Sequence, residues 1–71
     1  MAEQVNTQVA GNVWKVLVKP GDEIKAGDVL FILELMKMEV PHAAETDGRI
    51  SAVTISEGET VEADQPAVTI A

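Results

Sequence analysis

The residues best suited to chemistry lie in one short segment, residues 34–39, which read Glu-Leu-Met-Lys-Met-Glu. This segment interrupts a β-like pattern with two unbranched thioether side chains, Met36 and Met38, on either side of Lys37. A lysine at the tip of a tight hairpin would project into solvent on its four-carbon stem. Acylation of its ε-amine would remove the charge and create a long tether that carries a bound group between sites.

The lysine is not expected to react unaided. Attack on an activated carboxyl needs the neutral amine, whereas a free lysine, with a pKa of about 10.4, is almost fully protonated at pH 7. This acidic chain, with twelve Asp and Glu against five Lys and Arg, offers no obvious means of activating an amine. We therefore expect activation to come from a separate enzyme, while this chain supplies the presentation of Lys37.

The two methionines make the segment unusual. On alternate sides of a turn residue, Met36 and Met38 would be partly exposed, where apolar surface is unfavourable unless something binds it. Methionine is also an adaptable side chain that suits contacts with more than one partner. These residues alone leave two interpretations of Lys37 open. It is either a modified lysine or an ordinary solvated turn residue, as the other lysines of the chain are expected to be.

The elements that position this segment are predicted from an internal repeat. A shift of 37 positions superimposes Gly11 on Gly48 and continues through matched apolar residues and a second pair of glycines. Paired glycines at matched spacing are harder to attribute to chance than a few apolar matches. The repeat therefore predicts two halves, about residues 9–34 and 46–71, related by an approximate two-fold axis and joined by a hairpin at residues 35–39.

Each half has the pattern of β-structure. Residues 15–19 and 52–55 follow the period of two that is typical of a half-buried strand. The apolar interval becomes three at residues 13–16 and again at 50–53, which predicts one β-bulge in each half. No segment shows a convincing helical stripe. Short strands separated by turns predict an all-β fold, a small sandwich or barrel.

Turn signals separate these strands. Residues 20–22 and 57–59 each contain a glycine that is free to take a positive φ. Residues 25–28 form another turn with a glycine at its third position. The counterpart, residues 62–65, has Asp64 there instead, which is tolerable because Asp visits the left-handed region more readily than most residues.

Size and composition limit the remaining possibilities. The 71 residues fit a single domain, residues 1–71, and 46% of them are hydrophobic. Without cysteine, neither a disulfide framework nor a thiolate metal site is available, so stability must come from apolar packing. The lack of cysteine fits a reducing cytosol, and we find no secretory leader, so a cytoplasmic location is expected. No stretch approaches the roughly 20 apolar residues of a membrane span.

Charge argues against one class of partner, and residue types argue against catalysis. Phosphate backbones would repel a surface with a formal net charge of −7 that has no Lys or Arg cluster, so no nucleic-acid partner is expected. His42 is the only histidine and no cysteine is present, so neither a nucleophile–base pair nor a clustered metal site can be assembled. We expect His42 to be a surface residue. The chain is therefore not predicted to be an enzyme.

The sequence resembles the biotinyl/lipoyl attachment domains, specifically the biotin carboxyl carrier branch, over residues 9–70. Met-Lys-Met centred on a hairpin between two such repeats is a specific signal. The segments that carry the resemblance are residues 10–13, 18–24, 26–30, 34–39, 46–50 and 57–63. The resemblance implies a flattened barrel, or barrel-sandwich hybrid, of two four-stranded antiparallel sheets.

The resemblance also implies a function. In that family the lysine at the position of Lys37 is biotinylated by a biotin protein ligase. The carrier takes a carboxyl group at a biotin carboxylase and delivers it at a carboxyltransferase, which selects the substrate. Lys37 is then the acceptor, Met36 and Met38 are recognition residues, and Glu34 and Glu39 contribute charge that orients the hairpin. We expect a monomeric domain that is tethered to a larger complex or visits one.

Two alternatives remain beside this interpretation. A lipoyl domain, with lipoate on Lys37, shares fold and chemistry, but such domains typically place Asp before the lysine and a small residue after it. Methionine on both sides favours biotin. An unmodified module used for protein contacts would have no reason to keep Met-Lys-Met. The chain departs from the carrier pattern at Leu35, where the family usually has a small residue, and a bulkier side chain there would alter docking.

Overall fold

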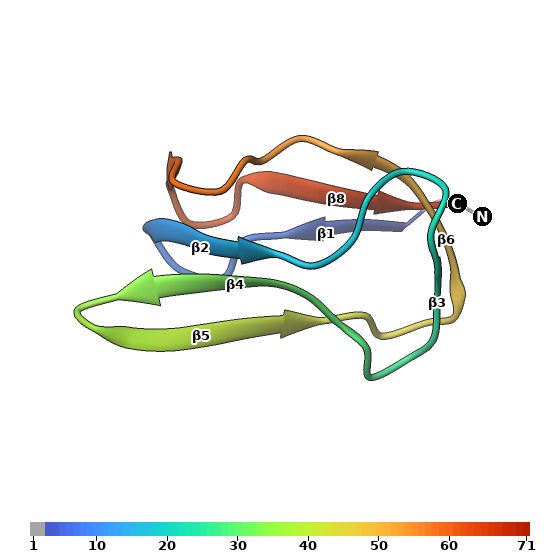
Figure 1. Ribbon diagram of the computed structural model, residues 1–71, viewed down its shortest axis with the longest axis horizontal. Helices are drawn as coiled ribbons and strands as arrows, with labels where there is room; N and C mark the ends of the chain where they lie inside the picture. The colour runs from blue at the N-terminus through green and yellow to red at the C-terminus, as the bar shows by residue number, and fades with distance from the viewer. Residues whose placement is uncertain (1–2) are drawn as a thin grey trace.

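The computed structural model describes residues 3–71 and folds them into eight β-strands with no helix. The strands are β1 (Glu3–Asn6), β2 (Gly11–Val16), β3 (Glu23–Ile24), β4 (Val29–Leu35), β5 (Met38–Ala43), β6 (Gly48–Val53), β7 (Thr60–Val61) and β8 (Pro66–Ile70). They form two four-stranded antiparallel sheets with the orders β1-β8-β6-β3 and β5-β4-β2-β7 (Figure 1). The prediction of a flattened barrel of two such sheets is confirmed.

The two sheets are related by the predicted repeat. The shift of 37 positions carries β2 onto β6 and β3 onto β7, and the order β5-β4-β2-β7 becomes β1-β8-β6-β3. The register of β2 against β4 shifts between Val13 and Lys15, and that of β6 against β8 shifts between Ile50 and Ala52. The pseudo-two-fold axis and the two predicted bulges are therefore confirmed.

The turns of each half bind to the first long strand of the other half. The backbone N–H of Gly21 donates to the carbonyl of Ile50 at 2.8 Å, and that of Gly58 donates to the carbonyl of Val13 at 2.8 Å. Both glycines have positive φ, 98° and 89°, a conformation that costs glycine little. Each half is consequently hydrogen-bonded to the other through these two turns.

The core lies between the sheets and is formed by buried apolar residues of the strands, together with two residues that follow β5 and β6. Its buried members are Val13, Ile24, Leu30, Phe31, Leu33, Ala44, Ile50, Ile55, Val61, Ala67, Val68 and Ile70. Phe31 is the largest of them, and it is fully buried. It pairs across β4 and β5 with His42, whereas the equivalent pair in the other sheet is Val68 with Val5. The half that carries the Lys37 hairpin thus has the bulkier core pair.

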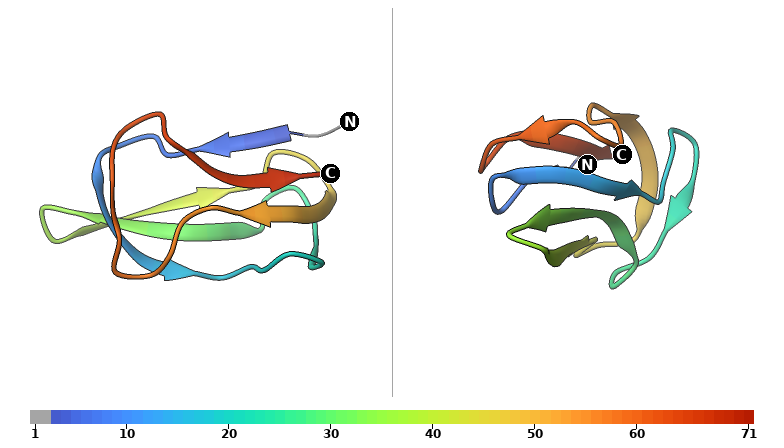
Figure 2. Two further views of the ribbon diagram at one scale, coloured as in Figure 1. Left: turned by 90° about the horizontal axis from the view of Figure 1, so that it is seen from above. Right: turned by 60° about the vertical axis from the view of Figure 1, so that its left-hand side comes forward.

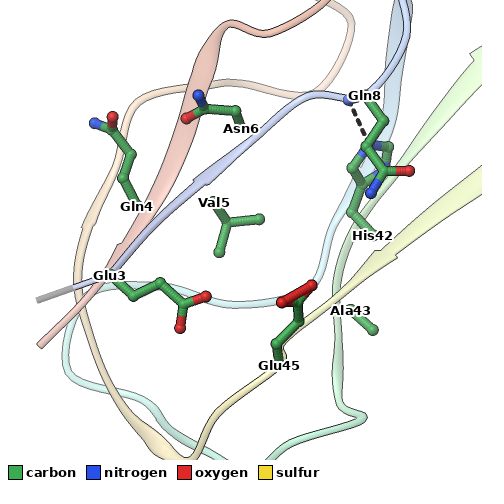
Figure 3. Close-up of a pocket in the computed structure, with 8 residues that line it drawn as sticks. All are labelled: Glu3, Gln4, Val5, Asn6, Gln8, His42, Ala43 and Glu45. Atoms are coloured by element: carbon green, nitrogen blue, oxygen red, sulfur yellow. Dashed lines mark hydrogen bonds between the residues drawn. The ribbon is translucent and has the colours of Figure 1, made fainter.

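His42 is buried, and its expected surface location was wrong. Its ring stacks on Phe31 with the centroids 4.5 Å apart. The backbone N–H of Gln8 donates to Nε2 at 2.9 Å (Figure 3), and Nδ1 lies 3.1 Å from the carbonyl of Val40. Both contacts are satisfied together by the neutral tautomer with hydrogen on Nδ1. Burial lowers the pKa of His42, and the hydrogen bond to Val40 only partly opposes this.

The joining hairpin and the ends of the chain lie at opposite poles of the molecule. The turn between β4 and β5 projects at one pole, while β1 and β8 bring Glu3 opposite Ile70 at the other (Figures 1 and 2). The described residues include no helix long and apolar enough to cross a membrane. The fold therefore places the Lys37 segment at the opposite end of the molecule from the start of β1 and the end of β8.

Candidate functional site

The predicted site lies on the turn of the β4–β5 hairpin. Leu35 and Met38 are the last paired residues, which leaves Met36 and Lys37 as a two-residue turn. Both turn residues have positive φ, 52° and 66°. Positive φ at both central positions is the signature of a type I′ turn, whose twist matches that of the flanking strands. Sequence patterning did not predict this conformation, because the turn favours Asn and Gly and neither is present.

This turn conformation is strained. An L-residue other than glycine loses about 1–2 kcal/mol in the left-handed region. Met36 and Lys37 occupy it in succession, and no glycine relieves them. Strain that the surrounding structure maintains is commonly found where a residue is presented for function. The register of β4 and β5, fixed by five further pairs below the turn, maintains it here.

The side chains of the turn stand in solvent. Lys37 is exposed, and Met36 and Met38 are 87% and 69% exposed. The salt bridges within residues 3–71 use Lys19 and Arg49, and neither reaches the hairpin. The amine of Lys37 is therefore available to a partner, between two apolar side chains that the fold leaves uncovered.

The base of the hairpin depends on Gly11. A Cβ added to Gly11 would lie 2.6 Å from the carbonyl oxygen of Glu34 and 3.7 Å from the Cβ of Leu35. The missing side chain thus lets β2 approach the strand that leads into the turn. Leu35, the departure from the family pattern, sits beside this glycine, exposed and opposite Met38. Its side chain extends the apolar surface of the hairpin below the tip.

The two glutamates flank the hairpin on its polar face. Glu34 in β4 and Glu39 in β5 pair directly with each other and are both exposed. Like charges directly opposite each other in a sheet are unfavourable by a few tenths of a kcal/mol to about 1 kcal/mol. The structure therefore gathers all five predicted site residues on one two-stranded hairpin, with negative charge beneath Lys37.

Elsewhere within residues 3–71, the structure offers Lys37 no chemical partner. His42 lies five residues down β5 and uses both ring nitrogens within the fold. A hollow of ≈ 190 Å³ between β1 and β5 includes no residue of the hairpin tip (Figure 3). Its lining consists of Glu3, Gln4, Val5, Asn6, Gln8, His42, Ala43 and Glu45. Residues 3–71 contain no cluster of His, Cys, Asp or Glu arranged to hold a metal ion. The geometry presents an amine and does not activate one.

The fold and this hairpin define a class of covalent carrier domain, and comparison with known proteins places the chain within it. Residues 2–70 match the sequence profile of the family described as "Biotin-requiring enzyme". The match covers nearly the whole chain. The chain belongs to this family, which confirms the resemblance inferred from its sequence.

One curated relative and two solved structures define the relationship further. The "Biotinylated protein TB7.3 homolog" of Mycobacterium leprae is 44% identical over 63 residues, 89% of each chain. The urea carboxylase of Kluyveromyces lactis superposes on all of this chain with a TM-score of 0.92 and 31% identity, and this chain spans 6% of that enzyme. The lipoyl domain of the Azotobacter vinelandii 2-oxoglutarate dehydrogenase complex superposes on 94% of this chain and 95% of its own, with a TM-score of 0.78 and 23% identity.

These relationships separate the leading interpretation from its rival. The family match, the biotinylated relative and the carboxylase structure confirm the prediction of a biotin-carrier domain, a non-catalytic component of carboxylases. The lipoyl domain shares the fold alone. Biotin is accordingly the cofactor of the class to which this chain belongs.

Proposed function

We propose that Lys37 is the residue to which biotin is covalently attached, and that a biotin protein ligase attaches it. The observation that carries the proposal is an exposed lysine on a projecting two-residue turn, between two exposed methionines. The amine fits an acyl group, because it is open to solvent and no salt bridge within residues 3–71 involves it. When bound, biotin supplies the nitrogen that carries a carboxyl group from one enzyme site to another.

Each residue of the hairpin has a separate role in presenting the lysine to its partners. Lys37 provides Nζ, which attacks the carboxyl carbon of biotin that the ligase has activated. The amide bond forms as the bond to the activating group breaks, that group leaves, and the amine proton passes to the partner or to solvent. Met36 and Met38 offer an apolar surface on both sides of that nitrogen. The turn fixes the direction in which the lysine stem leaves the sheet. Glu34 and Glu39 orient the hairpin toward basic surfaces of its partners.

The partners follow from this role. The related domain in urea carboxylase is a small part of a carboxylase chain, which supports carboxylase partners for this domain. We propose a biotin carboxylase, which loads the carboxyl group, and a carboxyltransferase, which accepts it. The domain acts as a cytoplasmic monomer that visits both. Its projecting hairpin and net charge of −7 suit transient docking into basic clefts.

Intact-mass measurement tests the proposal. The chain is co-expressed with an active biotin protein ligase, and we expect one biotin adduct on the wild type and none on Lys37→Arg. Lys25→Arg, a change at an exposed lysine outside the hairpin, is the matched control and should be fully biotinylated. All three proteins should give the same circular dichroism, because an exposed turn tip contributes little to stability.

Each contrary outcome is informative. An unmodified wild type, or a biotinylated Lys37→Arg variant, would overturn the assignment of Lys37. A lipoyl adduct in place of biotin would be identified by its own mass. It would mean that Lys37 carries lipoate and that the chain acts as a lipoyl domain. Loss of folding in Lys37→Arg would contradict the placement of this residue in open solvent.

A further inference from the structure

The hairpin is chemically unusual because the thioether side chains of two methionines are exposed to solvent. Met36 and Met38 are the only methionines within residues 3–71, and at 87% and 69% they are the most exposed of the large apolar side chains in that range. The accessibility of a thioether governs its oxidation by peroxide, which converts an apolar side chain into a polar sulfoxide. Among residues 3–71, the sulfur atoms open to oxidants are therefore the two that flank Lys37.

We propose that Met36 and Met38 are sites of reversible oxidation and that their oxidation prevents loading of Lys37. The inference rests on the proposed biotinylation of that lysine. A sulfur lone pair attacks one peroxide oxygen, the O–O bond breaks, and water leaves after proton transfer. Sulfur is oxidised by two electrons and the peroxide is reduced by two. A methionine sulfoxide reductase returns the thioether with two electrons and two protons from thiols, again releasing water.

Oxidation should act on docking and leave the fold intact. Because both side chains are exposed, water solvates the new S=O group and no buried contact of the core is broken. A partner that covers the hairpin, in contrast, must desolvate a polar oxygen on each side of the lysine. Leu35 and Met38 are cross-strand partners, so the sulfoxide at Met38 interrupts the apolar surface that continues to the base of the hairpin. The hairpin thus combines the acceptor amine with an oxidation-sensitive recognition surface.

The experiment compares loading before and after oxidation. Unbiotinylated protein is treated with hydrogen peroxide, and peptide mapping assigns each added oxygen to Met36, Met38, Met1 or Trp14. Initial rates of biotinylation are then measured with a biotin protein ligase, biotin and ATP. We expect conversion of both hairpin methionines to slow loading by about tenfold or more, the equivalent of about 1.4 kcal/mol. Reduction by the two stereospecific sulfoxide reductases should restore the rate.

A Met36→Leu/Met38→Leu double variant is the matched control. It keeps apolar side chains at both positions and retains Met1 and Trp14 as oxidisable residues. The ratio of its loading rate after and before peroxide should stay at one, whatever its starting rate. The single variants Met36→Leu and Met38→Leu then assign the effect to one sulfur or to both.

The possible failures can be told apart. Wild-type protein that accepts no biotin before treatment would overturn the proposed function and this inference together. Protein that loads before treatment and equally fast with both sulfoxides in place would overturn this inference alone. A double variant that slows as much as the wild type would also overturn it, since the damage would then lie outside the two methionines.

Discussion

The two halves of the chain share a strand order, matched bulges and crossing turn hydrogen bonds, yet they end differently. In one half β4 continues into β5 through Met36 and Lys37, and this turn closes a projecting hairpin (Figure 2). At the equivalent place in the other half, β8 pairs with β1, with Ile70 opposite Glu3, and these two strands are the last and first within the described residues. The symmetry is therefore broken where the lysine is presented, and the hairpin lies opposite the chain ends.

The cores of the halves differ in a related way. Phe31 and His42 stack in the sheet that carries the hairpin, where the other sheet has Val68 and Val5. The N–H of Gln8 ties this stack to the segment that connects β1 with β2. A hairpin that projects beyond the sheets gains few contacts at its tip. Its strands are anchored instead by a larger pair below the turn, which the other half does not need.

The largest expected effect comes from removing that anchor. Phe31→Ala should lower the free energy of unfolding by about 3–5 kcal/mol, because it deletes a fully buried aromatic ring and leaves a cavity. The equivalent change in the other half, Val68→Ala, removes only two methyl groups and should cost about 2 kcal/mol. Urea unfolding followed by Trp14 fluorescence measures both.

If Phe31→Ala does not fold at all, Phe31→Leu allows the stability losses at Phe31 and Val68 to be compared. A domain of this size has a small total stability, on the order of 5 kcal/mol. The leucine variant should lose less than Phe31→Ala and still unfold cooperatively. Equal losses at Phe31 and Val68 would contradict the view that the hairpin half depends on the larger anchor.

A smaller effect is a pH dependence of the free energy of unfolding, which should arise from His42 and therefore from the hairpin half alone. The pKa of His42 is lowered in the folded state, mainly by burial, so below the ordinary value of 6.5 the unfolded chain binds a proton that the folded chain does not. Stability therefore falls as pH falls through 6.5, with a slope of at most about 1.4 kcal/mol per pH unit. Urea unfolding at several pH values between about 7.5 and 5 gives this slope.

His42→Val copies the Val5 of the other half and supplies the control. Its unfolding free energy should be flat over the same pH interval. The pKa of Asp22 is also lowered, chiefly by a backbone hydrogen bond from Lys19, and its contribution is lost only below 3.8, outside this window. A variant that kept the wild-type slope would show that His42 is not the titrating group.

Sequence patterning predicted the internal repeat and the alternation of buried and exposed residues, whereas it misplaced His42, whose surroundings include a residue distant in the chain. The 37-residue shift gave both bulges and the two-fold axis, and it matched Asp64, which has a φ of 63°, with Gly27. The period of two in β5 places His42 on the same face as Val40, but its burial depends on Gln8, 34 positions away in the chain. A lone histidine carries no sign of such a partner.

The site was predictable in position and not in conformation. Residues 34–39 marked the hairpin because Met-Lys-Met interrupts the strand pattern and lies between the two halves. The positive φ of both Met36 and Lys37 was not predictable from residue types that disfavour it. It is imposed by the antiparallel register of β4 and β5, which leaves exactly the length of a two-residue turn.

The smallest expected effect concerns this turn. Here a single substitution should change the free energy of unfolding and the rate of biotinylation in opposite directions. Met36→Asn should raise the free energy of unfolding by about 0.5–1 kcal/mol, because Asn tolerates the left-handed region and suits a type I′ turn. The same change should slow biotinylation, since it removes an apolar side chain beside Lys37. Met36→Leu keeps the strain and should leave stability unchanged. Urea unfolding that finds Met36→Asn no more stable than Met36→Leu would contradict a strained turn. A gain in stability with a loss of loading would mean that methionine is retained at this position for recognition, against the preference of the backbone.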